Sequence, residues 1–222
     1  MHNRCGATDP DWLPYKTLVL PLAALALRYD LNTAGPALEG WFWGRALSQA
    51  YDVGSSTKVA SDYAALSAHL RDGEPLPVSR VSMKRLMDAT RKQNSAAWRT
   101  FMSLLLRNHA SDPTGTVMTD AVVSSLFPRM PGDDAPHLRV LGQVLTARST
   151  ARAQRRNGQW PVFATDGAAE ARRTQFLPDL NEVIFNTDAL LRGRADALQR
   201  YLNHEFNPDP PMFMVALVSR GS

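Results

Sequence analysis

The segment around residues 41–43 constrains the fold more than any other part of this chain. It places Trp41, Phe42 and Trp43 in a row. Successive residues of a helix lie about 100° apart, so Trp41 and Trp43 point about 200° apart and cannot share one narrow apolar stripe. Two surfaces must therefore receive them. A helix buried between two layers meets this requirement, and so does a helix whose Trp43 faces a ligand or a partner protein.

Arg45 belongs to the same helix and projects between two of these aromatic rings. A guanidinium in such surroundings needs a stacking or carboxylate partner, and Asp52 and Asp62 are the nearest acidic candidates. If the tryptophan motif forms an interface, Trp43 and Arg45 are the residues that we expect to bind the partner.

Apolar residues recur at helical spacing along most of the chain, which predicts a mainly α protein built as a multi-helical bundle. Val59, Tyr63, Leu66 and Leu70 show this spacing clearly, and Gly73 is expected to end their helix. The expected helices are 18–27, 36–51, 55–72, 83–87, 95–109, 119–127, 136–156, 166–175, 180–191 and 195–206, with at most a small β element at Trp160–Phe163.

Composition excludes several classes of protein. A chain of 222 residues with 44% hydrophobic and 21% charged residues is typical of a folded globular protein. A single cysteine, Cys5, excludes an intramolecular disulfide and a cysteine-rich zinc site, and it favours a reducing cytoplasm. The apolar run 18–27 contains Pro21 and has about half the length that crosses a bilayer. We therefore expect a cytoplasmic protein with no membrane partner.

A polar turn at residues 112–115 predicts a boundary between two domains. Residues 1–112 would form a helical domain that carries the tryptophan motif, and residues 113–222 a second, basic helical domain.

The expected helix 136–156 ends in a dense group of arginines, namely Arg148, Arg152, Arg155 and Arg156. Their spacings of four, three and one place the first three on one helical face. Such a face suits neutralisation of nucleic-acid phosphates, and the formal net charge of +4 favours a polyanionic partner. A solvated helix end whose cations complement the helix dipole explains the same residues.

The motifs of several common enzyme classes are absent from the sequence. It has no Gly-x-Ser-x-Gly elbow, no P-loop and no dinucleotide-binding glycine motif. His137 follows Asp133 and Asp134, which together could hold a metal, although a helix start with capping acids explains the same pattern. His204 lies beside Glu205 near an expected helix end. We expect no metal or cofactor from these residues.

The order of motifs resembles the C-terminal half of the GmrSD-type restriction proteins, bacterial anti-phage factors that join a ParB-like nucleotidase domain to an HNH nuclease domain. In that family a helix with Trp-Phe-Trp-Arg precedes a Tyr, a Gly-Ser-Ser-type turn and an acidic helix. The matching residues here are Trp41, Phe42, Trp43, Arg45, Tyr51, Gly54, Ser55, Ser56 and Asp62, with Gly44 as an extra residue. A leucine-rich helix similar to 98–107 follows, and the likeness continues weakly to residue 206.

The chain also departs from the family. Its ParB-like half is missing, so the chain resembles a piece or a stand-alone relative. The family's metal-binding His-Ile-Phe-Pro matches residues 125–128, which read Ser-Leu-Phe-Pro and follow Ser124. An HNH nuclease needs that imidazole to activate water beside its metal ion, and serine does not supply it. Asn181 falls in a Leu-Asn pair similar to the family's, so it joins His137 and His204 as a candidate catalytic residue.

Together these features predict a DNA-interacting, non-catalytic part of a restriction-type anti-phage defence protein. Two alternatives remain open. A divergent HNH-like, metal-dependent DNA endonuclease would use His137 or His204 in place of the lost motif and would need a divalent metal. A scaffold protein would instead dock a ParB-like partner through Trp43. The sequence leaves the oligomeric state and the DNA that is recognised open.

Overall fold

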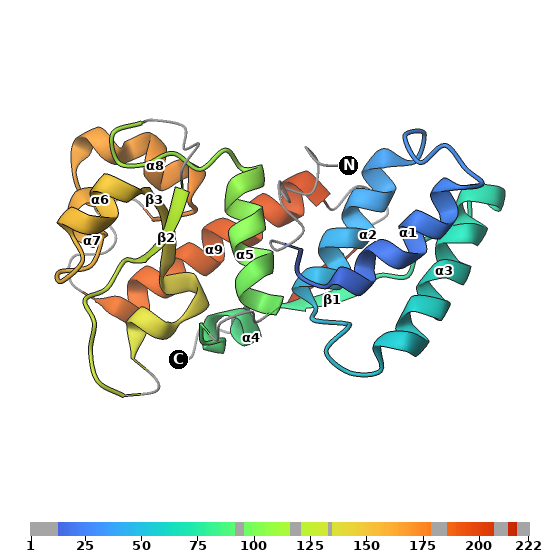
Figure 1. Ribbon diagram of the computed structural model, residues 1–222, viewed down its shortest axis with the longest axis horizontal. Helices are drawn as coiled ribbons and strands as arrows, with labels where there is room; N and C mark the ends of the chain where they lie inside the picture. Colours follow the sequence, from blue (N-terminus) through green and yellow to red (C-terminus); the bar gives the residue numbers. More distant parts are fainter. Residues whose placement is uncertain are drawn as a thin grey trace.

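The computed structural model describes residues 13–91, 96–115, 121–132, 135–178, 186–206 and 213–216, the last range as backbone only. Its architecture is mainly α, as predicted. The N-terminal helices form one end of the molecule, a small β-hairpin with short helices forms the other, and α5 and α9 lie between them (Figure 1). None of the helices in the described ranges has the length and apolar character that crossing a bilayer would require.

The N-terminal end contains α1 (Val19–Ala26), α2 (Gly35–Leu47) and α3 (Ser55–Asp72), close to the predicted boundaries. Local signals explain them. Pro36 occupies the first turn of α2, where its missing N–H costs nothing. Gly73 closes α3 in the left-handed conformation, with φ of 73°. Helix α1 packs against α3 and leaves Leu20 and Leu27 exposed.

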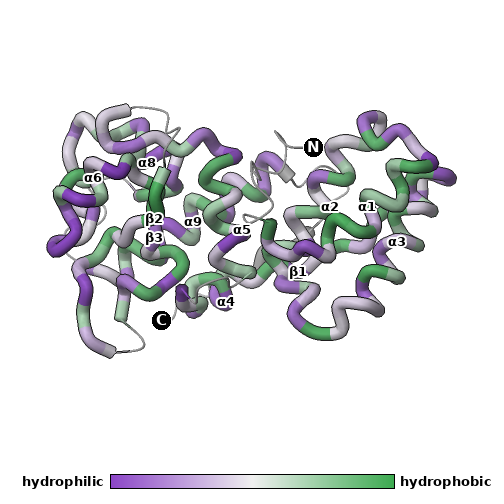
Figure 2. The backbone as a smooth tube through the Cα atoms, viewed as in Figure 1, coloured by the Kyte–Doolittle hydropathy of each residue, from purple (hydrophilic) through white to green (hydrophobic). Residues whose placement is uncertain are grey.

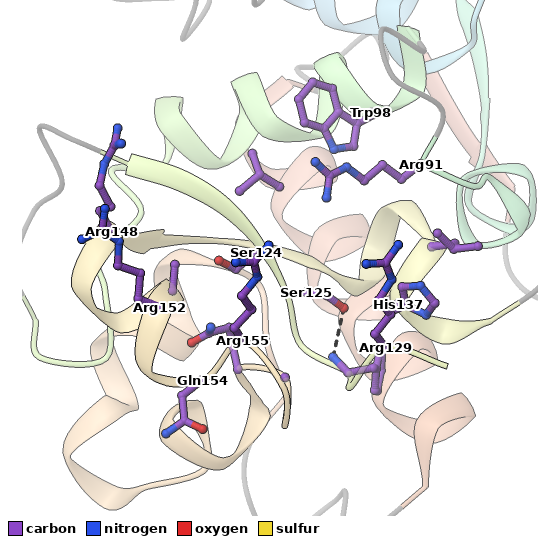
Figure 3. A pocket seen from close by; sticks show the side chains of 16 residues that line it. Arg91, Trp98, Ser124, Ser125, Arg129, His137, Arg148, Arg152, Gln154 and Arg155 are labelled. Atoms are coloured by element: carbon purple, nitrogen blue, oxygen red, sulfur yellow. Dashed lines mark hydrogen bonds between the residues drawn. The ribbon is translucent and has the colours of Figure 1, made fainter. Parts of the chain in front are cut away.

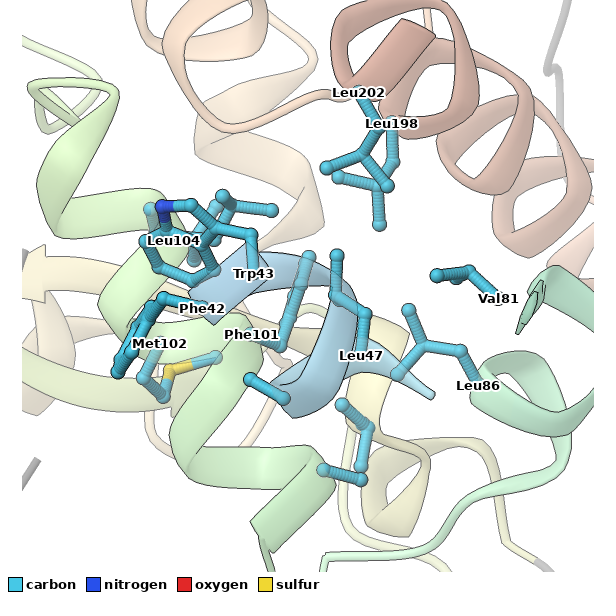
Figure 4. Close-up of a cluster of buried hydrophobic side chains, with 14 of the residues drawn as sticks. Phe42, Trp43, Leu47, Val81, Leu86, Phe101, Met102, Leu104, Leu198 and Leu202 are labelled. Atoms are coloured by element: carbon cyan, nitrogen blue, oxygen red, sulfur yellow. The ribbon is translucent and has the colours of Figure 1, made fainter. Parts of the chain in front are cut away.

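Both tryptophans of the motif are buried, at 2% exposure for Trp41 and 0% for Trp43. Helix α2 contacts α5 (Ala96–Arg107) and α9 (Thr187–Phe206), and Figure 4 shows Phe42 and Trp43 beside Met102 and Leu104 of α5. The two-layer interpretation of the motif is therefore correct. The expectation that Trp43 faces a partner is wrong, because neighbouring helices already cover its ring.

Arg45 has the carboxylate partner that the sequence predicted. Its guanidinium makes a two-point contact with Asp62 of α3, at 3.1 Å from Nε and 2.5 Å from a terminal nitrogen. The hydroxyl of Tyr51 donates to the same carboxylate at 2.8 Å, and burial, followed by this bond, raises the pKa of Tyr51. Arg45 therefore joins α2 to α3 and is not presented to a partner, which corrects the expected interface role.

The main hydrophobic core extends across the expected domain boundary at residue 112. It includes Leu105 of α5, Val140 and Leu145 from the C-terminal half, and Leu198 of α9, together with the tryptophans. A smaller cluster under the hairpin contains Leu126, Val144, Ala168, Ala171, Leu177, Leu190 and Phe163. Apolar stretches occur from one end of the molecule to the other (Figure 2). The two expected halves thus share one main core.

Two strands that the sequence did not predict connect distant parts of the chain. Strand β1 (Ser79–Ser82) precedes α4 (Met83–Asp88) and pairs in parallel with β4 (Phe213–Ala216). Each strand has only four residues, so neither shows a periodicity long enough to identify it.

The region that carries the arginines folds differently from the prediction. The expected helix 119–127 is strand β2 (Ala121–Ser125), and most of the expected helix 136–156 is two 3₁₀ turns and strand β3 (Gln143–Ala147). The strands form an antiparallel pair in which Ser125 lies opposite Gln143. The α-helix in this segment is α6 (Arg148–Ala153). β-Branched residues, Val122, Val123, Val144 and Thr146, favour the pleated sheet.

The small β element therefore exists, but not where the sequence placed it. The segment expected to form it is helix α7 (Trp160–Phe163). After the 3₁₀ turn η5 (Asp166–Ala168) and α8 (Ala169–Thr174), helix α9 continues without the break expected at 191–195.

Candidate nucleic-acid interface

A cavity of about 870 Å³ opens between the β2–β3 hairpin, α6 and the start of α5 (Figure 3). Strand β2 contributes Ser124 and Ser125, and α6 contributes Arg148 and Arg152. Trp98 of α5 forms part of the opposite wall. Segments far apart in the sequence thus form one concave surface.

Positive charge dominates this cavity. Its described lining contains Arg91, Arg129, Arg148, Arg152 and Arg155, and no Asp or Glu. Cations gathered in a concave, partly apolar site focus a positive potential and raise the local concentration of anions. The arrangement is suited to bind an anion larger than a single inorganic ion.

Three of the four predicted arginines line the cavity, although a long helix does not carry them. Strand β3 runs directly into α6, so Arg148 is the first helical residue, and Arg152 follows one turn later. Arg155 comes from the turn after α6. All three side chains are exposed, whereas Arg156 is exposed but does not line the cavity. Arg148, Arg152 and Arg155 thus line one cavity, but the predicted single helical face is wrong, because Arg155 lies outside α6.

Gly158 holds the arginine segment, residues 148–156, against the end of β2. It has φ of +74°, and an added Cβ would lie 2.5 Å from the carbonyl carbon of Phe127 and 2.8 Å from the nitrogen of Pro128. The next two amides continue this close contact. Gln159 N donates to the carbonyl of Ser125 at 2.9 Å, and Trp160 N donates to that of Leu126 at 3.0 Å.

Ser124 and Ser125, which the sequence resemblance matches to a histidine position, have structural hydrogen bonds. Ser124 Oγ lies 2.9 Å from Oγ1 of Thr146 across the strand pair, which links β2 to β3. Ser125 Oγ accepts from the backbone N–H of Phe127 at 3.1 Å. These bonds stabilise the hairpin and its turn. A serine hydroxyl at this place does not supply the imidazole that an HNH nuclease uses as its general base.

His137 lines the cavity, but its hydrogen bond does not suit a general base. Its Nδ1 accepts from the backbone N–H of Met130 at 3.3 Å. Burial, with a smaller contribution from Arg129, lowers the pKa of His137. A neutral imidazole that accepts at Nδ1 carries its proton on Nε2, so this ring offers the cavity a donor.

The other catalytic candidates do not join His137. His204 is exposed on α9, where its Nδ1 lies 3.2 Å from Glu205 Oε1, and it does not line the cavity. Asn181, Asp133 and Asp134 lie outside the described residues. Within the described ranges, no three His, Cys, Asp or Glu side chains gather where they could hold a metal ion.

Sequence reasoning missed Arg91 and the role of Trp98 as a cavity wall. The Arg91 guanidinium lies over the Trp98 ring at 5.7 Å from its centroid and donates to Gln143 Oε1 at 3.3 Å. Partial burial lowers the pKa of Arg91. The backbone N–H of Arg91 donates to the carbonyl of Leu138, which brings this loop beside the hairpin. No local motif marks Arg91, because two of its partners, Leu138 and Gln143, are about fifty residues away in sequence.

A buried arginine holds the hairpin against the rest of the fold. Arg194 of α9 is fully buried and donates from one nitrogen to the carbonyls of Leu141 and Gln143, each at 2.6 Å. Its guanidinium also lies over Phe101, 4.7 Å from the ring centroid, and burial lowers the pKa of Arg194 to about 9. Gln175 completes the attachment by bonding the N–H and carbonyl of Leu145, at 2.8 and 2.7 Å.

No protein-family model, no curated protein and no solved structure matches this chain. The resemblance to GmrSD-type restriction proteins therefore rests on the sequence motifs and stays a prediction.

Proposed function

We propose that this chain binds nucleic acid, with DNA as the expected partner, through the arginine-lined cavity and the surface around it. The observation that carries the proposal is the convergence of Arg148, Arg152 and Arg155 with Arg91 and Arg129 on one cavity whose described lining has no carboxylate. A phosphate backbone is the common cellular polyanion that needs several guanidinium groups at once.

Contacts of this kind position a strand without reading its sequence. Guanidinium–phosphate pairs carry no information about the bases, so we expect sequence-tolerant binding with a steep salt dependence. Gly158 and the hairpin hold the arginine segment in place before a ligand arrives, which reduces the ordering cost of binding.

The proposed role is non-catalytic. Ser124 and Ser125 support the hairpin, and the His137 ring presents a donor. The sequence resemblance supports a place in a restriction-type anti-phage defence system of the bacterial cytoplasm, in which this part holds DNA for a ParB-like domain or subunit. Docking through Trp43 is not part of the proposal, because that side chain is buried.

Replacement of Arg148, Arg152 and Arg155 together by Gln tests the proposal. We expect duplex affinity to fall about equally for unrelated sequences, and the slope of log affinity against log salt to fall by roughly two to three. Fluorescence anisotropy of a labelled duplex at several salt concentrations measures both quantities.

A matched control removes the same charge elsewhere. Arg28, Arg80 and Arg200 are exposed and do not line the cavity, so their joint replacement by Gln should leave most of the affinity and the slope unchanged. Equal losses in the two triple variants would show only a dependence on net charge. Such a result, or no duplex binding by the native chain at about 50 mM salt, refutes the proposal.

A further inference from the structure

The size of the cavity restricts what can enter it. A volume of about 870 Å³ lies within the range of roughly 300 to 1,000 Å³ that holds drug-sized ligands. This space accommodates one or two nucleotides. A paired duplex presents its bases stacked inside two backbones, so only its phosphates can reach the rim.

The two sides of the cavity also differ in chemistry. Figure 3 shows Arg148 and Arg152 on one side and Trp98 with Arg91 on the other. The first side offers charge to a phosphate. The second offers a half-buried indole and a guanidinium plane, and these are the surfaces on which unpaired bases stack. A ligand with anionic and aromatic parts satisfies both sides at once.

The number of cations distinguishes a strand from a nucleoside monophosphate. Five arginines line the cavity, namely Arg91, Arg129, Arg148, Arg152 and Arg155. A terminal phosphate carries a charge of only about −1.5 to −2 near neutral pH. Several phosphates are needed to neutralise such a surface, and consecutive nucleotides of one strand supply them.

Resting on the proposed nucleic-acid function, we propose that the cavity receives an unpaired nucleotide of a single-stranded segment. Its base lies against Trp98 and Arg91, and its flanking phosphates lie on Arg148, Arg152 and Arg155. His137 and Ser124 also line the cavity and offer hydrogen-bonding groups to the nucleotide. The protein therefore prefers strand ends, bulges and gaps to continuous duplex.

The test measures the affinity of the full chain for four labelled probes by fluorescence anisotropy. They are a continuous duplex, the same duplex with one unpaired thymidine, the same duplex with an abasic unit in place of that thymidine, and a single strand. We expect the thymidine bulge and the single strand to bind about ten-fold more tightly than the continuous duplex, equivalent to about 1.4 kcal/mol. The abasic bulge should lose most of this gain, because it keeps the phosphates and lacks the base.

Variants of Trp98 test whether the preference for an unpaired thymidine depends on the cavity. Trp98→Ala should lower the affinity for the thymidine bulge about ten-fold more than the affinity for the abasic bulge, whereas Trp98→Phe should keep most of the difference between these two probes. If Trp98→Ala fails to fold, the abasic probe on the native chain still decides the question.

The outcomes separate this inference from the proposed function. Equal affinity for the duplex and both bulges overturns the unpaired-nucleotide inference and leaves duplex binding intact. Competition by thymidine monophosphate at the affinity of the single strand also overturns it, in favour of a free-nucleotide site. Absence of binding to all four probes refutes the proposed function itself.

Discussion

Gly158 gives a sharp test of how the arginine segment is held. Its φ of +74° lies in the left-handed region, which residues other than glycine adopt at a cost of about 1–2 kcal/mol. In Gly158→Ala, the new Cβ would also meet the carbonyl oxygen of Leu126, with the carbonyl carbon of Phe127 at 2.5 Å. These are backbone atoms, which cannot move aside by a change of rotamer.

Relief of this clash must separate the segment from the end of β2. That movement breaks the bonds from Gln159 N to Ser125 O and from Trp160 N to Leu126 O, each worth about 0.5–1.5 kcal/mol. The backbone strain and the two lost bonds together predict a loss of roughly 2–5 kcal/mol in the free energy of unfolding.

Urea denaturation followed by circular dichroism measures this loss. Gly167→Ala is the matched control, because an added Cβ there meets no atom within 4 Å and its φ is not in the left-handed region. The control should change stability by less than about 1 kcal/mol. A stability of Gly158→Ala within about 0.5 kcal/mol of the native chain would refute the proposed attachment.

Two further predictions concern the buried motif and the cavity histidine. Trp41→Ala and Trp43→Ala should each lower the free energy of unfolding by about 3–5 kcal/mol in urea melts, because both rings lie in the core. A much smaller loss for Trp43→Ala would contradict its place in the core. An NMR titration should give His137 a pKa below its usual 6.5 and a proton on Nε2. Because the folded-state pKa is lowered, the stability from this neutral ring is present above the unfolded pKa and is lost as pH falls through the folded value. Because Ser124 and Ser125 supply no general base, plasmid DNA should stay intact with the chain and magnesium, manganese or zinc, and cleavage that His137→Ala abolishes would contradict the non-catalytic role.

Local sequence signals were sufficient for the N-terminal helices. The periodic spacing of α3 and its closing glycine, Gly73, appear within one segment, so no distant contact is needed to predict them. The opposed directions of Trp41 and Trp43 likewise required two packed layers, and the position of Arg45 indicated an acidic partner, which is Asp62. The spacing of the arginines after residue 147 also grouped three residues that line one cavity, although the helical face predicted for them is wrong.

The tertiary structure alone decided the shape of the candidate site. Strands β2 and β3 are short and contain apolar residues that fit a helix as well as a sheet, so only their pairing distinguishes the two. Arg91 reaches Trp98 and Gln143 through contacts that no local pattern encodes, and the buried Arg194 anchors the hairpin from a helix about fifty residues away in sequence. Helical periodicity and capping act within a few residues, whereas a cavity is defined by which segments pack together.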